Sequence, residues 1–199
     1  SVLTDVETNL LSWTNEKSQI YKVNADSGKD TEISEELSGY LERLLKIAKD
    51  SDGAFDPTIG KLIRLWDIGG ENQRIPGEDE IQEVLKDSGY QKISLDGNTI
   101  HMDEGCSLDL GAAGKGIGCD LILENLKNQK DVTAALMNLG GSSVMTYGSK
   151  PDGSSWNVAV TDPRAENDDD YLGVVALNGT EFLSTSGDYE KYFIEDGVR

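Results

Sequence analysis

The sequence has little of the chemistry that many hydrolases and metal enzymes use, since it contains one histidine and two cysteines in 199 residues. A serine nucleophile needs a histidine base and a third group to orient that base, and His101 falls in an expected hairpin with no such partner in view. Triad hydrolysis is therefore excluded. Cys106 and Cys119 have neither a CxxC redox spacing nor the spacing of a metal cluster, and the sequence leaves open whether they pair with each other.

Positive charge is also scarce, because 18 Lys and Arg stand against 37 Asp and Glu and give a formal net charge of -19. Proteins that bind nucleic acid take their affinity from clustered basic side chains, so nucleic acid is excluded as a partner. A phosphate-bearing ligand would need positive charge supplied locally by a lysine, by backbone amides or by a metal ion. Long apolar runs are missing too, since no stretch approaches the ~20 apolar residues of a membrane-spanning helix.

The pattern of apolar residues predicts a single α+β domain over residues 1–199, with helices gathered early and antiparallel strands gathered late. Ser34 is the expected N-cap of the second helix, and Asn178-Gly179 predicts a hairpin between the last two strands. Helices are expected over residues 2–13, 37–48, 59–66 and 81–85 and, after a glycine-rich turn, through Leu121, Ile122 and Leu126. Strands are expected over residues 92–95, 99–102, 108–110, 133–139, 143–147, 156–160, 172–177 and around 182.

The C-terminal residues predict an unfinished hairpin. Residues 189–194 have the pattern of a strand, residues 195–197 that of a turn, and Val198-Arg199 that of the start of a return strand. We therefore expect the biological protein to continue beyond Arg199.

The most informative segment is LDLGAAGKG, residues 108–116, between an expected strand and an expected helix. It is not a P-loop, because only two residues separate Gly111 from Gly114 and no Ser or Thr follows Lys115, and it lacks the third glycine of a Rossmann fingerprint. Glycines, helix N-terminal amides and the Lys115 ammonium would suit an anionic or dinucleotide ligand, and Asp109 could accept hydrogen bonds from a base or ribose. The alternative is a tight strand-to-helix connection with a solvated lysine.

Two further segments carry the same ambiguity. In DGAFDPT, residues 52–58, Pro57 forces Asp56 out of the helical region, so that Asp56 either contacts a ligand or caps the next helix. In NLGGS, residues 138–142, paired glycines after a strand allow either a bulge or the close approach of a ligand.

Together, and in this order, these segments resemble the ApbE family of FAD:protein FMN transferases. The combination is more specific than any single glycine loop, and it extends over nearly the whole chain. Six motifs carry the resemblance: DGAFDPT (52–58), LW (65–66), LDLGAAGKG (108–116), NLGG (138–141), DPR (162–164) and TSGDY (185–189).

The resemblance implies an α+β fold in which antiparallel sheet is flanked by helices and a flavin lies in a cleft between them. It also implies a chain shorter than the family domain at both ends, without an N-terminal strand and a C-terminal metal-site segment. By the same resemblance Ala112 provides a backbone carbonyl to a metal ion. The implied FAD-binding residues are Ala54, Phe55, Asp56, Asp109, Lys115 and, in an early segment near Trp13, Thr14.

The implied reaction is the transfer of FMN from FAD to a threonine hydroxyl of an acceptor redox protein, with release of AMP. Mg²⁺ is the expected ion, because it prefers oxygen ligands and neutralises charge on the pyrophosphate. The catalytic residues and the remaining metal ligands are expected beyond Arg199. The family also implies export and tethering to the outer face of the cytoplasmic membrane, as a lipoprotein, through an anchor preceding this sequence. The rival functions are an FAD pyrophosphatase, in which water replaces threonine, and a non-catalytic FAD-binding module.

Overall fold

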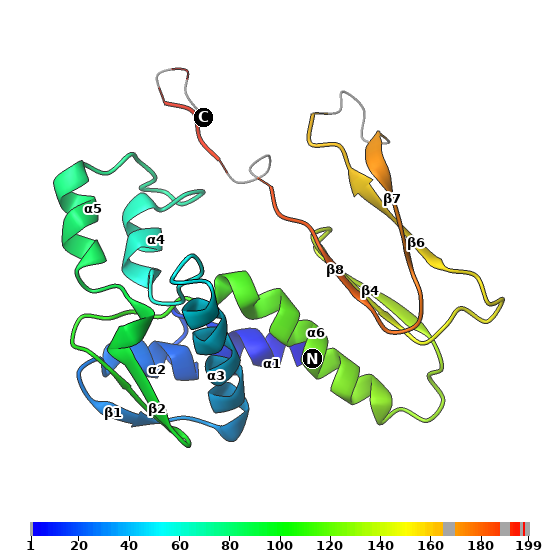
Figure 1. Cartoon of the computed structure of the whole chain (residues 1–199), viewed down its shortest axis with the longest axis horizontal. Coiled ribbons are helices and arrows are strands. Elements are labelled where there is room, and N and C mark those ends of the chain that lie inside the picture. Colours follow the sequence, from blue (N-terminus) through cyan, green and yellow to red (C-terminus); the bar gives the residue numbers. More distant parts are fainter. Residues whose placement is uncertain (1, 165–169, 188–191, 196, 198–199) are drawn as a thin grey trace. The chain divides into compact units, whose positions relative to one another are not determined.

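The structure is a computed structural model that describes residues 2–164, 170–187, 192–195 and 197. It divides into two compact units, Ser1–Gly114 and Lys115–Arg199, and the division falls within helix α6 (Gly111–Lys127) (Figure 1). No helix among the described residues combines the length and the apolar character that crossing a membrane requires.

The first unit contains the first four of the predicted helices, and the fifth, through Leu121, Ile122 and Leu126, falls within α6. The longest, α3, shows why its residues form a helix: the Ser34 hydroxyl accepts a hydrogen bond of 3.1 Å from the Leu37 amide, as predicted, and four apolar side chains at helical spacing, including Leu41 and Leu44, are buried. The helices of this unit are α1 (Val2–Asp5), the π-helical η1 (Val6–Leu11), α2 (Gln19–Ala25), α3 (Glu35–Asp50), α4 (Gly60–Trp66), α5 (Glu78–Leu85) and the 3₁₀ turn η2 (Tyr90–Lys92).

The sheet of the first unit has the antiparallel order β1-β3-β2, formed by β1 (Asp30–Glu32), β2 (Ile93–Asp96) and β3 (Thr99–Met102). The predicted hairpin of β2 and β3 is confirmed, with Ile93 opposite Met102. The core of this unit includes Ile20, Leu37 and Ile100, each at most 1% exposed. Helix α2 and strand β1 were not predicted, because α2 buries only Ile20 and Val23 and β1 has three residues, so neither shows a visible period.

The predicted strand over residues 108–110 is wrong. Leu108 is fully buried, as a strand residue would be, but its backbone amide and carbonyl bond to the side-chain amide of Asn24 at 2.7 and 2.9 Å. The next amide, of Asp109, bonds to the carbonyl of Pro57. A side chain and a loop carbonyl thus provide the partners that a neighbouring strand would have supplied.

The described residues of the second unit form two antiparallel sheets, ordered β4-β5-β8 and β6-β7 (Figure 1). Their strands agree with the predicted ranges to within two residues. The buried residues of this unit include Val144 and Met145 on β5, and Ile117 and Ile122 on α6. The strands are β4 (Ala135–Leu139), β5 (Ser143–Tyr147), β6 (Trp156–Thr161), β7 (Tyr171–Leu177) and β8 (Phe182–Ser184).

The hairpin predicted at Asn178-Gly179 is wrong, because β7 pairs with β6 whereas β8 pairs with β5. The turn carries the chain from one sheet to the other. Its exit is fixed by Thr146 on β5, whose amide donates to the Glu181 carbonyl at 2.9 Å while its hydroxyl accepts from the Glu181 amide at 3.2 Å. Residues 189–191 of the predicted strand 189–194 lie outside the described residues, as do Val198 and Arg199, and residues 192–194 form no strand.

Candidate functional site

The loop of residues 52–58 is held in shape by the carboxylate of Asp56. Its Oδ1 accepts hydrogen bonds from the amide and the hydroxyl of Thr58, at 2.8 and 2.6 Å, and its Oδ2 accepts one from the amide of Tyr90 at 2.9 Å. The buried Thr58 hydroxyl accepts a further hydrogen bond of 2.6 Å from the amide of Gly89. Asp56 and Thr58 therefore attach this loop to the start of η2.

The alternative that Asp56 caps the following helix is wrong, because Ile59 occupies the N-cap of α4 and no side chain caps it. Asp56 instead bonds to the turn that precedes the helix. Beside it, Ala54 is exposed and Phe55 is half-buried. These two residues are available on the surface next to a carboxylate that is already bound within the chain.

Asp109, the second residue of the glycine-rich segment, is hydrogen-bonded to the loop of residues 52–58. The Asp109 amide donates to the Pro57 carbonyl at 2.9 Å, and its Oδ1 accepts from the Gly111 amide at 2.7 Å. Residues 111–116 do not form the expected turn: helix α6 already begins at Gly111. The structure therefore brings Asp109 together with the segment that contains Ala54, Phe55 and Asp56.

Arg64 on α4 is a charged neighbour of Asp109 that the sequence analysis missed. Its Nη2 donates a hydrogen bond of 2.7 Å to the Ser107 hydroxyl, and its Cζ lies 5.2 Å from the centroid of the Trp13 ring. Partial burial lowers the pKa of Arg64, and the negative charge of Asp109 opposes that shift. The available signal was an arginine just before the LW motif in a chain that needs local positive charge.

Thr14 lies next to this group in the chain. It is exposed, and its hydroxyl is 3.1 Å from the hydroxyl of Ser12, which also accepts hydrogen bonds from the amides of Thr14 and Asn15. Trp13 is 40% exposed, so part of its ring surface is accessible to a ligand.

Lys115 lies in the first turns of α6 and belongs to the second unit. Its ammonium donates a hydrogen bond to the hydroxyl of Ser142, in the turn that joins β4 to β5. Gly140 and Gly141 form that turn with φ of +65° and +76°, a backbone conformation that residues other than glycine rarely adopt. The glycine pair therefore makes a tight hairpin turn that places Ser142 beside Lys115.

Ser142 also joins this turn to the TSGDY motif. Its carbonyl accepts a hydrogen bond of 2.8 Å from the Thr185 amide. Asp188 and Tyr189 of this motif lie outside the described residues. Three of the motifs singled out in the sequence, at Lys115, at 138–142 and at 185–187, are thus connected by hydrogen bonds within the second unit.

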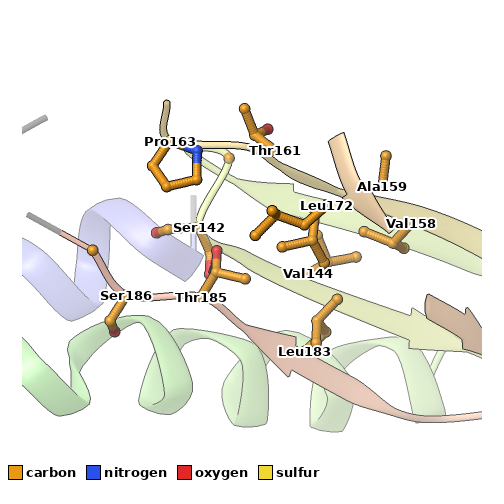
Figure 2. Close-up of a pocket in the computed structure, with 13 residues that line it drawn as sticks. Ser142, Val144, Val158, Ala159, Thr161, Pro163, Leu172, Leu183, Thr185 and Ser186 are labelled. Atoms are coloured by element: carbon orange, nitrogen blue, oxygen red, sulfur yellow. Dashed lines mark hydrogen bonds between the residues drawn. The ribbon is translucent and has the colours of Figure 1, made fainter. Parts of the chain in front are cut away.

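A cavity of about 380 Å³ opens beside these residues, between the two sheets of the second unit. Figure 2 shows the hydroxyl-bearing Ser142, Thr185 and Ser186 at one end and the apolar Val144 and Leu183 toward the other. The cavity is therefore polar where it meets the motif residues and apolar along β5 and β8.

A metal site is not evident in the described part of the chain, which contains no group of three or more His, Cys, Asp or Glu side chains arranged around a common point. Ala112 is exposed in the first turn of α6, where a carbonyl ordinarily accepts the hydrogen bond of the amide four residues on. The predicted ligand thus lies on a helix and has no carboxylate cluster around it among the described residues. Cys106 and Cys119 are both free and buried.

Comparison with known proteins places these motifs in one family. The model of the ApbE family matches residues 2–199. The FAD:protein FMN transferase of Treponema pallidum is 31% identical over 206 residues, which cover 96% of this chain and 56% of that protein. The crystal structure of the ApbE protein of Thermotoga maritima is similar with a TM-score of 0.89 and 33% identity, covering 99% of this chain and 64% of that one.

The flavinyl transferase ApbE of Pseudomonas stutzeri, in its apo form, matches with a TM-score of 0.81 and 31% identity over 98% of this chain and 60% of its own. These structures confirm the expected α+β fold of helices and antiparallel sheet. The chain spans 56% of the length of the Treponema relative and 64% of the Thermotoga one. Both the family model and these similarities lead to the same conclusion, that the chain belongs to the ApbE family.

Proposed function

We propose that the protein transfers FMN from FAD to an acceptor protein. The observation that carries the proposal is the similarity, over 96% of this chain, to a relative named FAD:protein FMN transferase. The motifs of this chain are consistent with it, because the segment of Ala54, Phe55 and Asp56 is hydrogen-bonded to Asp109 through Pro57. In this proposal these residues bind FAD, with Thr14 beside them.

The chain's charge also fits a local phosphate site. With a net charge of -19 the protein repels anions at a distance, so an ammonium at the site is needed to hold a pyrophosphate. We assign this role to Lys115. Its hydrogen bond to Ser142 holds the ammonium at one place before a ligand arrives, which reduces the entropy lost on binding.

In the proposed reaction the acceptor's threonine oxygen forms a bond to the phosphorus of the FMN half of FAD. The bond from that phosphorus to the bridging oxygen breaks, the oxygen leaves with AMP, and the hydroxyl proton passes to a base. We propose Mg²⁺ as a requirement of the whole protein. The described residues do not supply its ligand set, since Ala112 provides one carbonyl, so no step of the reaction is derived through the ion.

The test incubates the full-length protein with FAD, Mg²⁺ and a threonine-bearing acceptor. Flavin fluorescence of the acceptor on a denaturing gel, with one AMP released per flavin attached, is the expected result. Free FMN and AMP without a labelled acceptor would support the pyrophosphatase instead, and intact FAD after long incubation would support a binding module. Omitting Mg²⁺ tests the requirement for the ion. Replacing the acceptor's threonine by alanine tests whether that residue receives the FMN.

Export and tethering to a membrane belong to the same proposal and depend on the family resemblance. Cell fractionation of the producing organism, with an antibody against this chain, tests them. Recovery in the cytosolic fraction would contradict them without bearing on the transferase activity.

A further inference from the structure

Arg64 joins three stretches of the first unit that are far apart in the sequence. It projects from α4, donates a hydrogen bond of 2.7 Å to the hydroxyl of the buried Ser107, and stacks 5.2 Å from the centroid of the Trp13 ring. Asp109, two residues after Ser107, attracts its charge. One guanidinium thus contacts the early segment at Trp13 and the residue that immediately precedes the glycine-rich segment, Ser107.

The geometry is one that only arginine provides. A guanidinium is planar, with hydrogen-bond donors around its edge and a face that stacks on aromatic rings. Here the edge binds Ser107 while the group lies over Trp13, and both interactions form at a half-buried position where the charge is partly desolvated. Cation–π contacts gain strength under such desolvation. A lysine ammonium could keep the charge near Asp109 but could not make both contacts in the same way.

The partners of Arg64 are the residues that border the proposed FAD site. Trp13 adjoins Thr14 and remains 40% exposed, and Asp109 is hydrogen-bonded to the loop of residues 52–58. The guanidinium therefore contacts Trp13 with its face and Ser107 through Nη2, and it is attracted by the charge of Asp109.

We propose that Arg64 is a positioning residue of the FAD site, which acts on the ligand by fixing the Trp13 indole and the segment of Ser107 to Asp109. The inference rests on the proposed function only in taking FAD as the ligand. In this proposal α4, through Arg64, aligns the segment around Trp13 with Asp109. The glycine-rich segment alone cannot produce that alignment.

The experiment measures FAD affinity of the full-length protein by flavin fluorescence titration, without acceptor. Arg64→Ala is expected to weaken FAD binding roughly tenfold. Arg64→Lys should recover part of that loss, because the charge near Asp109 returns. The matched control is Arg43→Ala, which removes the guanidinium that lies 5.6 Å from the Tyr40 ring on α3 and should leave FAD affinity unchanged. Circular dichroism melting checks that each variant is folded.

A double-mutant cycle separates positioning from direct contact. If Arg64 acts partly through Trp13, then Arg64→Ala should have a clearly smaller effect in a Trp13→Ala background than in the wild type. In the wild type it should also increase the acrylamide quenching of the Trp13 emission, identified by difference from Trp13→Ala. In turnover it should raise the KM for FAD and leave the KM for the acceptor unchanged.

An equal loss of FAD affinity in both backgrounds, or an unchanged affinity in folded Arg64→Ala, would overturn the positioning role. An equal loss in Arg43→Ala would also overturn it. The transferase proposal is tested independently, because FAD binding is measured without transfer: a wild-type protein that binds FAD but labels no acceptor would contradict the transferase activity alone. A wild type that binds no FAD would overturn both.

Discussion

The backbone amide of Asp109 donates a hydrogen bond of 2.9 Å to the carbonyl of Pro57. This bond connects two segments, residues 52–58 and 108–116, that are far apart in the sequence and that both resemble motifs of one family. It fixes the start of the glycine-rich segment against the loop that contains Phe55 and Asp56. The two segments therefore form one structural group within the first unit, and their side chains can be tested as a group.

Asp109→Ala is expected to weaken FAD binding by roughly tenfold to a hundredfold, because hydrogen bonds to a charged group contribute ~1.5–3 kcal/mol. The carboxylate also accepts the Gly111 amide at 2.7 Å, so Asp109→Asn serves as a control that keeps an acceptor oxygen for the start of α6. Fluorescence titration with FAD measures both variants. Unchanged titration of folded Asp109→Ala would exclude the residue from the FAD site.

Lys115→Ala is expected to weaken FAD affinity by a similar factor, because the ammonium opposes the charge of the pyrophosphate. Ser142→Ala is the matched control, since it removes only the hydroxyl to which Lys115 is bound. We expect a loss of at most a few-fold for this variant, measured in the same titration. A larger loss in Ser142→Ala than in Lys115→Ala would show that the hydroxyl, and not the ammonium, carries the binding.

Asp56→Ala should lower the stability of the first unit, because the amides of Thr58 and Tyr90 and the Thr58 hydroxyl lose their acceptor. We expect a decrease of about 2 kcal/mol in the free energy of unfolding. Thr58→Val removes the hydroxyl between Asp56 and Gly89 and should have a comparable cost. Urea unfolding followed by circular dichroism measures both variants.

FAD titration of the same two variants decides whether Asp56 also contacts the ligand. If it does, Asp56→Ala loses affinity while Thr58→Val largely retains it. Equal FAD affinities in the two variants would mean that Asp56 stabilises the loop and does not contact the ligand.

Gly148→Ala should destabilise the second unit much more than Gly153→Ala. Both glycines have positive φ, +63° and +74°, so an alanine at either position costs the same ~1–2 kcal/mol for adopting the left-handed conformation. A Cβ at Gly148 would in addition lie 2.1 Å from the Thr133 carbonyl oxygen, whereas a Cβ at Gly153 would meet nothing within 4 Å. We expect Gly148→Ala to cost about 3 kcal/mol or more beyond the control in urea unfolding. Similar values for the two variants would contradict the close approach at Thr133.

Cys106 should make the protein less stable at alkaline pH. Burial raises the pKa of its thiol from 9.0 to about 11, so the folded chain keeps a proton that the unfolded chain releases. The free energy of unfolding therefore falls as pH rises from about 9 to about 11, by up to ~3 kcal/mol. Cys106→Ala removes this contribution. In urea unfolding at pH 8 and pH 10.5, the decrease between the two should be about 2 kcal/mol larger in the wild type. Equal decreases would contradict the raised pKa.

The elements that could be predicted from the sequence are those whose signals are local. Helix α3 has a capping serine and buried residues at helical spacing, and the β2–β3 hairpin has turn residues between two short strands. The hairpin at Asn178-Gly179 has an equally strong local signal, yet it does not form, because the bonds from Thr146 to Glu181 and the pairing of β8 with β5 take precedence. Long-range pairing of this kind leaves no trace in a window of a few residues.

In the candidate site, too, features with a local sequence signal could be predicted and features that depend on long-range contacts could not. The motifs of Asp56, Asp109 and Lys115 could be recognised because each is a short run of unusual residues. The role of Arg64 could not, because its contacts with Trp13 and Ser107 join positions far apart in the chain. The bonds of Asn24 to Leu108 were missed for the same reason, and they explain why a buried apolar stretch is not a strand. All the ligand assignments stay predictions: those of Ala54, Phe55, Asp56, Asp109, Lys115 and Thr14 to FAD, and that of Ala112 to a metal ion.

The crossing at Asn178-Gly179 has a consequence for the order of folding. Because β8 pairs with β5, the antiparallel pair of β6 and β7 lies in the chain between two strands that are neighbours in another sheet. Local pairing loses less chain entropy than pairing across a long loop, so β6 and β7 should associate early, and β8 should join β5 afterwards. Once that pair has formed, it shortens the effective loop that the last pairing must close. Leu183→Ala, on β8 opposite Val144, should then mainly speed unfolding.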